Sequence, residues 1–182
     1  MILAISGPPG SGKTTVAESY ARLHGFDLVS AGAAFRQEAA DRGITLERFG
    51  AYAESHEEID RNLDAAIVAE VDKRAVAGTS VVVDGRVQPW LLSKRRIRCF
   101  KVLIDAPLDV RAERIAEREG KGLSVARREI LERERSERAR YLKIYGIDVR
   151  DASGFDLVID SSNRSPKAIV EMIAERVARW AN

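Results

Sequence analysis

The chain has 182 residues, 45% hydrophobic and 32% charged, which predicts one globular domain with a substantial core. Its formal net charge of +2 gives little support for nucleic-acid binding by the molecule as a whole. The single cysteine, Cys99, excludes a disulfide framework, and its apolar neighbours predict a buried, unreactive thiol. Neither a secretion signal nor a membrane-spanning run is evident, so we expect a cytoplasmic protein. We also expect a monomer.

The first predicted strand, residues 2–6, leads directly into a glycine-rich loop. This loop reads Gly7-Pro8-Pro9-Gly10-Ser11-Gly12-Lys13-Thr14-Thr15 and matches the phosphate-binding pattern G-x-x-x-x-G-K-[ST]. In such a loop, backbone N–H groups and the N-terminus of the next helix surround an anion. The lysine reaches the β- and γ-phosphates, and the Thr14 hydroxyl is a ligand of Mg²⁺. The loop therefore predicts a nucleoside triphosphate site with Mg²⁺ as cofactor.

Four more apolar runs are predicted as strands, over residues 27–30, 80–84, 98–104 and 156–160. Their continuous apolar character indicates strands covered on both faces, as in a parallel sheet. We therefore expect an α/β fold with a five-stranded parallel sheet flanked by helices. Ser55-His56-Glu57-Glu58 has the sequence of a capping box, and Ser165-Pro166 predicts the start of the last helix.

Two long helical stretches interrupt the alternation of strands and helices. Residues 31–78 predict two or three short helices before a longer one. Residues 108–146 predict two helices, 108–119 and 124–145, with a glycine hinge between them. The single domain then has a core of residues 1–30, 79–107 and 147–182 with two helical insertions.

Candidate site residues lie at the end of the second and third strands or just after them: Ser30, Gly32, Arg36, Asp84, Gly85 and Arg86. Carboxyl ends of parallel strands meet at one edge of a sheet, where ligands of α/β proteins bind. Arg36 and Arg86 are suited to hold a phosphate, and Gly85 permits close backbone approach. Asp84 is a candidate for the Mg²⁺ site, with Thr14. The alternatives are a solvated Arg36 and an Asp84 that merely forms a turn.

The second insertion contains arginines at helical spacing: Arg111, Arg114, Arg118, Arg133 and Arg140. Cationic side chains on a hinged segment can stabilise the negative charge that develops in phosphoryl transfer. The alternative is a charged helix stabilised by the pairs Glu129–Arg133 and Glu134–Arg138.

Asp60 and Asp64 lie one helical turn apart in the first insertion. A carboxylate accepts hydrogen bonds from an exocyclic amine such as that of cytosine or adenine, so both are candidates for base recognition. Two solvated carboxylates are an equally good interpretation of this spacing.

With these residues identified, the chain resembles the small archaeal-type cytidylate kinases of the nucleoside monophosphate kinase group, from residue 1 to about 162. The resemblance rests on the loop, on Asp84-Gly85-Arg86 and on the arginine-rich motifs of the second insertion. It implies a P-loop kinase fold in which residues 31–78 bind the monophosphate and residues 108–146 form a lid. The sequence departs from the family at Val87-Gln88-Pro89, where small residues usually precede the tryptophan.

The same resemblance implies Mg²⁺-dependent transfer of the γ-phosphoryl group from ATP to CMP, and to dCMP as well. It assigns the transferred group to Lys13 and the lid arginines Arg114, Arg118, Arg133 and Arg140. It assigns the phosphate of the acceptor to Ser30, Arg36 and Arg86.

Three alternatives to this function stay open at the level of sequence. An adenylate kinase or another small-molecule kinase would use the same scaffold. A regulatory nucleotide switch would usually carry an Asn-Lys-x-Asp turn, whereas Asn163-Arg164-Ser165-Pro166 follows the last strand here. An RNA-binding protein is supported only by the arginine cluster.

Overall fold

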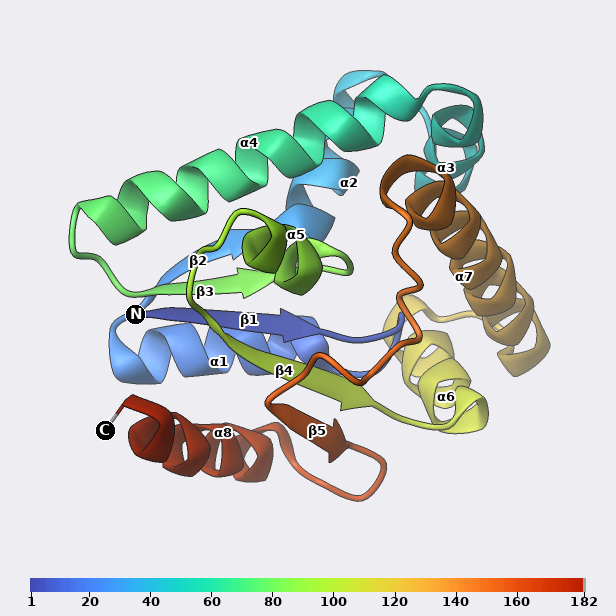
Figure 1. The fold of residues 1–182 in the computed structure, drawn as a ribbon. Coiled ribbons are helices and arrows are strands. Elements are labelled where there is room, and N and C mark those ends of the chain that lie inside the picture. The colour runs from blue at the N-terminus through green and yellow to red at the C-terminus, as the bar shows by residue number, and fades with distance from the viewer. Residues whose placement is uncertain (182) are drawn as a thin grey trace.

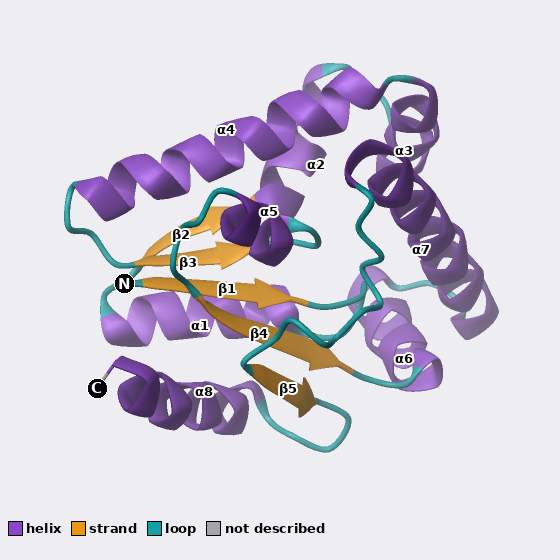
Figure 2. Ribbon diagram, viewed as in Figure 1, coloured by secondary structure: helices purple, strands orange, loops and turns teal. Residues whose placement is uncertain are grey.

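A computed structural model describes residues 1–181 as a sheet with helices on both faces (Figures 1 and 2). The strands are β1 (Ile2–Ser6), β2 (Asp27–Ser30), β3 (Val81–Asp84), β4 (Phe100–Asp105) and β5 (Leu157–Asp160). The helices are α1 (Lys13–His24), α2 (Ala31–Asp41), α3 (Leu46–Ser55), α4 (Glu57–Val76), α5 (Gln88–Lys94), α6 (Leu108–Glu119), α7 (Leu123–Tyr145) and α8 (Pro166–Ala181). The strand order is β2-β3-β1-β4-β5. All neighbouring strands are parallel, which confirms the predicted five-stranded parallel sheet.

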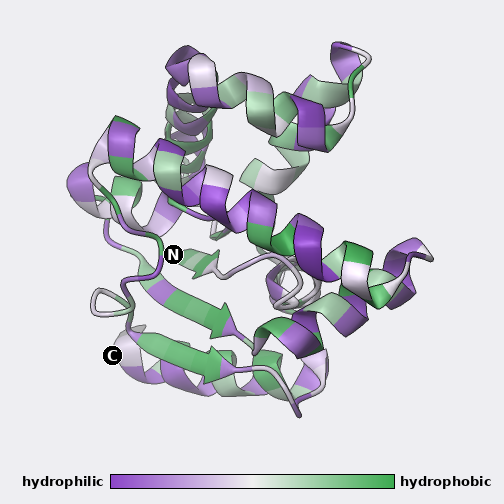
Figure 3. Cartoon of the chain, turned by 90° about the vertical axis from the view of Figure 1, so that its right-hand side faces the viewer, coloured by the Kyte–Doolittle hydropathy of each residue, from purple (hydrophilic) through white to green (hydrophobic). Residues whose placement is uncertain are grey.

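Side chains of the central strand alternate between the two faces of the sheet. Leu3 and Ile5 pack in the cluster formed with α1 and α8, whereas Ile2 and Ala4 pack in the cluster formed with α4 and α5. Ile169, Ile173 and Val177 form an apolar stripe on α8 that joins the first cluster. Cys99 is buried in the second cluster, and burial raises the pKa of its thiol to about 11. Figure 3 shows the strands as mainly hydrophobic and the helices as mixed.

The two predicted helical insertions follow the carboxyl ends of two strands. Helices α2, α3 and α4 come after β2, with a small core around the fully buried Phe49. Helices α6 and α7 come after β4 and pack on one another through Ile115 and Ile130. Both insertions therefore lie at the edge of the sheet where the phosphate-binding loop leaves β1 (Figure 1).

Of the two helix starts predicted from capping residues, one is confirmed and the other is wrong. Ser165 caps α8 as predicted, because its Oγ accepts from the Ala168 N–H at 3.2 Å. The predicted capping box is wrong, since Ser55 is the last residue of α3 and its hydroxyl donates to the Tyr52 carbonyl. Helix α4 instead starts after His56, whose side chain makes no cap hydrogen bond.

Strand β1 begins at the edge of the sheet opposite the loop, and α8 runs back to that same edge (Figure 1). None of the helices in the described part of the chain combines the length and apolar character needed to span a membrane.

Candidate active site

The glycine-rich loop has the local geometry that its sequence predicts. Gly10 and Gly12 adopt φ angles of 81° and 88°, which L side chains rarely tolerate. A Cβ on Gly7 would lie 2.1 Å from the Ile104 carbonyl oxygen. Helix α1 begins at Lys13, so its unpaired N-terminal N–H groups and partial positive charge face the loop. The loop is thus shaped as an anion site.

Two side chains from other elements hold this loop in place. Arg111, on α6, donates from its guanidinium to the Pro9 carbonyl at 3.0 Å and to Glu134 Oε1 at 2.7 Å. The Ser161 hydroxyl, just after β5, donates to the Ser11 carbonyl at 2.8 Å. Helices α6 and α7 and the end of β5 therefore position the loop, and Arg111 acts on the loop backbone.

Asp84 provides a carboxylate beside the loop. Its Oδ2 accepts from the Thr14 hydroxyl at 2.9 Å and from the Ser30 hydroxyl at 3.0 Å. Its Oδ1 is buried and has no hydrogen-bond partner among residues 1–181. The register of the sheet explains the cluster, because Ser30 on β2 lies directly beside Asp84 on β3. A free, buried carboxylate oxygen next to a threonine hydroxyl fits Mg²⁺, which prefers hard oxygen ligands.

Lys13 projects into the same region. Its ammonium donates to the Pro8 carbonyl at 3.5 Å, a long hydrogen bond that leaves its other two N–H donors for a ligand. Burial is the main cause that lowers the pKa of Lys13 to about 8; Asp84 and Glu137 oppose this effect, whereas the charges of Arg86 and Arg133 contribute to it. An anionic ligand would favour the charged ammonium.

A cavity of about 360 Å³ brings most of the predicted site residues together. Gly7, Pro8 and Ser30 do not line it, although Ser30 contacts it through Asp84. The predicted residues in its wall come from the loop, both insertions and β3: Pro9, Gly10, Ser11, Gly12, Lys13, Thr14, Thr15, Gly32, Arg36, Asp60, Asp64, Asp84, Gly85, Arg86, Arg114, Arg118, Arg133 and Arg140.

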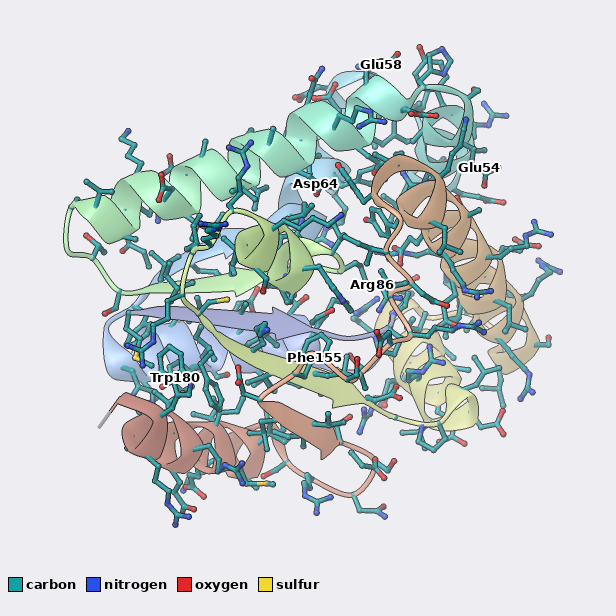
Figure 4. All side chains as sticks on the ribbon, in the orientation of Figure 1. Glu54, Glu58, Asp64, Arg86, Phe155 and Trp180 are labelled. Carbon is teal, nitrogen blue, oxygen red and sulfur yellow. The ribbon has the colours of Figure 1, made fainter. Side chains whose placement is uncertain are left out.

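Glu137, on α7, connects two arginines that line the cavity. Its carboxylate accepts from Arg86 Nε at 2.8 Å and from Arg133 Nε at 2.7 Å. Burial alone would raise the pKa of Glu137, but the charges of Arg133 and Arg86 lower it to about 2. Because both bonds use Nε, the terminal nitrogens of the two guanidinium groups remain for phosphate oxygens. Figure 4 shows Arg86 between the sheet and α7.

Asp60 and Arg140, both predicted site residues, bind one another. Arg140 Nη1 donates to Asp60 Oδ1 at 3.0 Å and to Oδ2 at 2.9 Å, and both side chains are buried. The pair joins α4 to α7, that is, the first insertion to the second. Burial raises the pKa of Asp60, and Arg140 opposes this effect. In this structure the two side chains therefore bind each other.

Two further predicted arginines on α6, Arg114 and Arg118, have different surroundings. Arg114 donates to the hydroxyl of Ser161 at 3.0 Å and to its carbonyl at 2.7 Å, whereas Arg118 is exposed and pairs with Glu119. The two suggested helical pairs do not form. Instead, four other contacts occur: Arg133 with Glu137, Lys121 with Glu129, Arg111 with Glu134, and Arg138 with Asp148.

Among the side chains that hold predicted site residues in place, Gln88, Glu137, Tyr145 and Ser161 were not predicted. Gln88 lies at the start of α5, a seven-residue helix that sequence analysis did not identify. The sequence does contain a signal for the pairing of Glu137 with Arg133, since the two residues lie four positions apart on the same helix. Tyr145 ends α7 and contacts α4, a contact between distant segments that local patterns cannot reveal.

Comparison with known proteins identifies relatives along nearly the whole chain. A family model described as the cytidylate kinase-like family matches residues 2–163. The cytidylate kinase of Pyrococcus abyssi is 43% identical over 176 residues, which cover 95% of this chain and 91% of that protein. The cytidylate kinase of Archaeoglobus fulgidus is 44% identical over 177 residues, covering 97% of this chain and 94% of that protein.

Solved structures agree with the fold. A protein from Eubacterium ventriosum superposes with a TM-score of 0.71 at 19% identity, covering 98% of both chains. Shikimate kinase from Acinetobacter baumannii superposes with a TM-score of 0.62 at 17% identity, covering 98% of this chain and 93% of that one. These similarities support a P-loop kinase fold, and the sequence match is more specific. The chain therefore belongs to the cytidylate kinase-like family.

Proposed function

We propose that the protein is a cytidylate kinase that transfers the γ-phosphoryl group of ATP to CMP and dCMP. The observation that supports this best is the shared cavity, where the phosphate-binding loop faces residues of both insertions. The names of the relatives at 43% and 44% identity support CMP as the acceptor. In this proposal residues 31–78 bind the monophosphate and residues 108–146 form the lid.

Catalysis in this proposal is mainly positioning and charge stabilisation. The loop amides and Lys13 hold the β- and γ-phosphates, while Arg36 and Arg86 hold the acceptor phosphate. Arg133, fixed through Glu137, presents cationic nitrogens toward the cavity. Arg114 and Arg118 line the cavity from α6 and add two more cations to its wall. Lid closure excludes water, which otherwise competes with CMP for the phosphoryl group.

Mg²⁺ would be held by the Thr14 hydroxyl and the free oxygen of Asp84, the latter directly or through a water. When bound, it neutralises charge on the phosphate oxygens of ATP. Asp84 also accepts from the Ser30 hydroxyl, which fixes the carboxylate between the loop and the start of α2. Ser30 in turn caps α2 by accepting from the Ala33 N–H at 3.2 Å.

The acceptor is tested with a coupled assay that offers CMP, dCMP, UMP, AMP and GMP with ATP and Mg²⁺. We expect the highest kcat/KM with CMP. A preference for AMP would assign the protein to adenylate kinases instead. Binding of ATP and GTP without turnover of any monophosphate would favour a nucleotide switch. Salt-sensitive retention of RNA at low ionic strength would revive the RNA-binding alternative.

Replacing Arg36 by alanine is expected to raise KM for CMP roughly 10- to 100-fold, because a charged hydrogen bond to the acceptor phosphate is lost. KM for ATP should change little. Arg36 lines the cavity from the first turns of α2. Arg48→Ala is the matched control, since Arg48 is an exposed arginine of the same insertion. Unchanged acceptor kinetics in Arg36→Ala would place the phosphate of CMP elsewhere.

A further inference from the structure

Asp64 is held by neutral donors from two other helices. Its Oδ1 accepts from Gln88 Nε2 of α5 at 2.7 Å, and its Oδ2 accepts from the Tyr145 hydroxyl of α7 at 2.9 Å. Asp64 itself lies on α4, is 3% exposed and lines the cavity. In Figure 4 its label lies beside the inner side of α4, above Arg86. Three helices therefore fix one carboxylate at the acceptor end of the site.

The hydrogen bonds of Asp64 leave part of its acceptor capacity unused. A carboxylate can accept about four hydrogen bonds, and the two described donors occupy one position on each oxygen. Asp60, one turn earlier, also accepts one hydrogen bond on each oxygen, but its donor is the Arg140 cation, which neutralises its charge. Among residues 1–181, the hydrogen bonds of Asp64 come from an amide and a phenol and not from a cation. Asp64 is thus the better placed of the two to accept from a ligand.

The orientation of the Gln88 amide is fixed by its surroundings. Its Oε1 accepts from the Val87 N–H at 3.1 Å, so Nε2 is the atom that faces Asp64. Gln88 is 1% exposed. A Cβ on Gly85 would lie 1.9 Å from Gln88 Oε1, so glycine is required at this position for Gln88 to occupy its place. The donor to Asp64 is consequently built into the turn that also carries Arg86.

We propose that Gln88 and Tyr145 are positioning residues that hold Asp64 as the acceptor for the exocyclic amine of the nucleobase. This inference rests on the proposed function and adds the residues that select the base. An ionised Asp64 accepts from the 4-amino group of cytosine and repels the 4-carbonyl oxygen of uracil. The cluster therefore selects CMP over UMP.

The charge of Asp64 gives this selection a pH dependence. Burial is the main cause that raises the pKa of Asp64 to about 7; the hydrogen bonds from Tyr145 and Gln88 and the charge of Arg140 oppose this effect, and the charge of Asp60 contributes to it. Tyr141 of α7 also faces this group. Below pH 7 the carboxyl group of Asp64 is protonated and can donate a hydrogen bond to the 4-carbonyl oxygen of uracil. Selectivity for CMP should therefore rise with pH.

The test measures kcat/KM for CMP and for UMP at about pH 6 and about pH 8 and compares their ratio. The phosphate groups of both acceptors titrate alike, and the fraction of folded enzyme cancels in a ratio measured on one preparation. In the wild-type protein we expect the CMP/UMP ratio to rise several-fold between these pH values. Gln88→Leu and Tyr145→Phe should each lower the ratio at about pH 8 by roughly 5-fold or more.

Gln37→Leu is the matched control, because Gln37 forms the same type of bond with Asp41, at 2.7 Å, on the exposed side of α2. It should keep the wild-type ratio. The inference is overturned if Gln88→Leu and Tyr145→Phe both retain the wild-type ratio at both pH values. A wild-type protein that phosphorylates neither CMP nor UMP contradicts the proposed function instead.

Discussion

Lys13→Ala is expected to lower kcat by at least roughly two to three orders of magnitude, the usual effect of removing one preorganised charge-stabilising donor. Lys13 is the cation of the phosphate-binding loop, and the wall of the cavity holds it close to Asp84, Arg86 and Glu137. Its charge is needed most when the phosphoryl group moves between ATP and CMP. The measurement is a steady-state assay with ATP, Mg²⁺ and CMP.

The control for this variant is Lys73→Ala, at the exposed C-terminal end of α4. It should retain wild-type kcat. Because the pKa of Lys13 is lowered to about 8, kcat/KM for ATP in the wild-type protein should fall as pH rises above about 8, where free Lys13 loses its proton. A Lys13→Ala enzyme with kcat within a few-fold of wild type would remove Lys13 from catalysis.

Glu137→Gln should destabilise the protein by roughly 3–5 kcal/mol, since it leaves a buried guanidinium without its counter-charge. The Arg86 side chain is 9% exposed and has little access to water, whereas that of Arg133 is 39% exposed and can be hydrated. Most of the loss should therefore arise from Arg86. Urea unfolding monitored by circular dichroism at neutral pH measures the change.

The pH dependence of this deficit follows from the direction of the pKa shift. The pKa of Glu137 falls from 4.5 to about 2 in the folded protein, so its stabilising effect is complete above pH 4.5 and disappears as pH falls toward 2. The difference between wild type and Glu137→Gln should shrink over that interval. Glu117→Gln, an exposed site on α6, is the matched control. Equal unfolding free energies at neutral pH would contradict this role of Glu137.

Much of the fold could be predicted because its signals are local. Each predicted strand appears within two residues of its expected limits, since runs such as Val81-Val82-Val83 are buried on both faces. The break between α6 and α7 follows from Gly120 and Gly122. Helix α5 was missed because seven residues with an early proline give no clear period.

The sequence predicts which residues form the candidate site. It does not predict which hydrogen bonds and ion pairs these residues make with one another. The strand ends that carry Ser30 and Asp84 are sequence features, and the parallel register brings them together. Which carboxylate binds which arginine depends on the packing of α4 against α7, which no local pattern encodes. The pairing of Asp60 with Arg140, and the hydrogen bonds that Asp64 accepts from Gln88 and Tyr145, could therefore be learned only from the structure.

The arrangement of β1 and α8 has a practical consequence for handling the protein. Both elements have their outer ends at the sheet edge remote from the glycine-rich loop (Figure 1). An affinity tag or fluorescent fusion joined ahead of Met1 emerges on the side away from the glycine-rich loop. Surface immobilisation through such a tag should consequently leave substrate entry unobstructed.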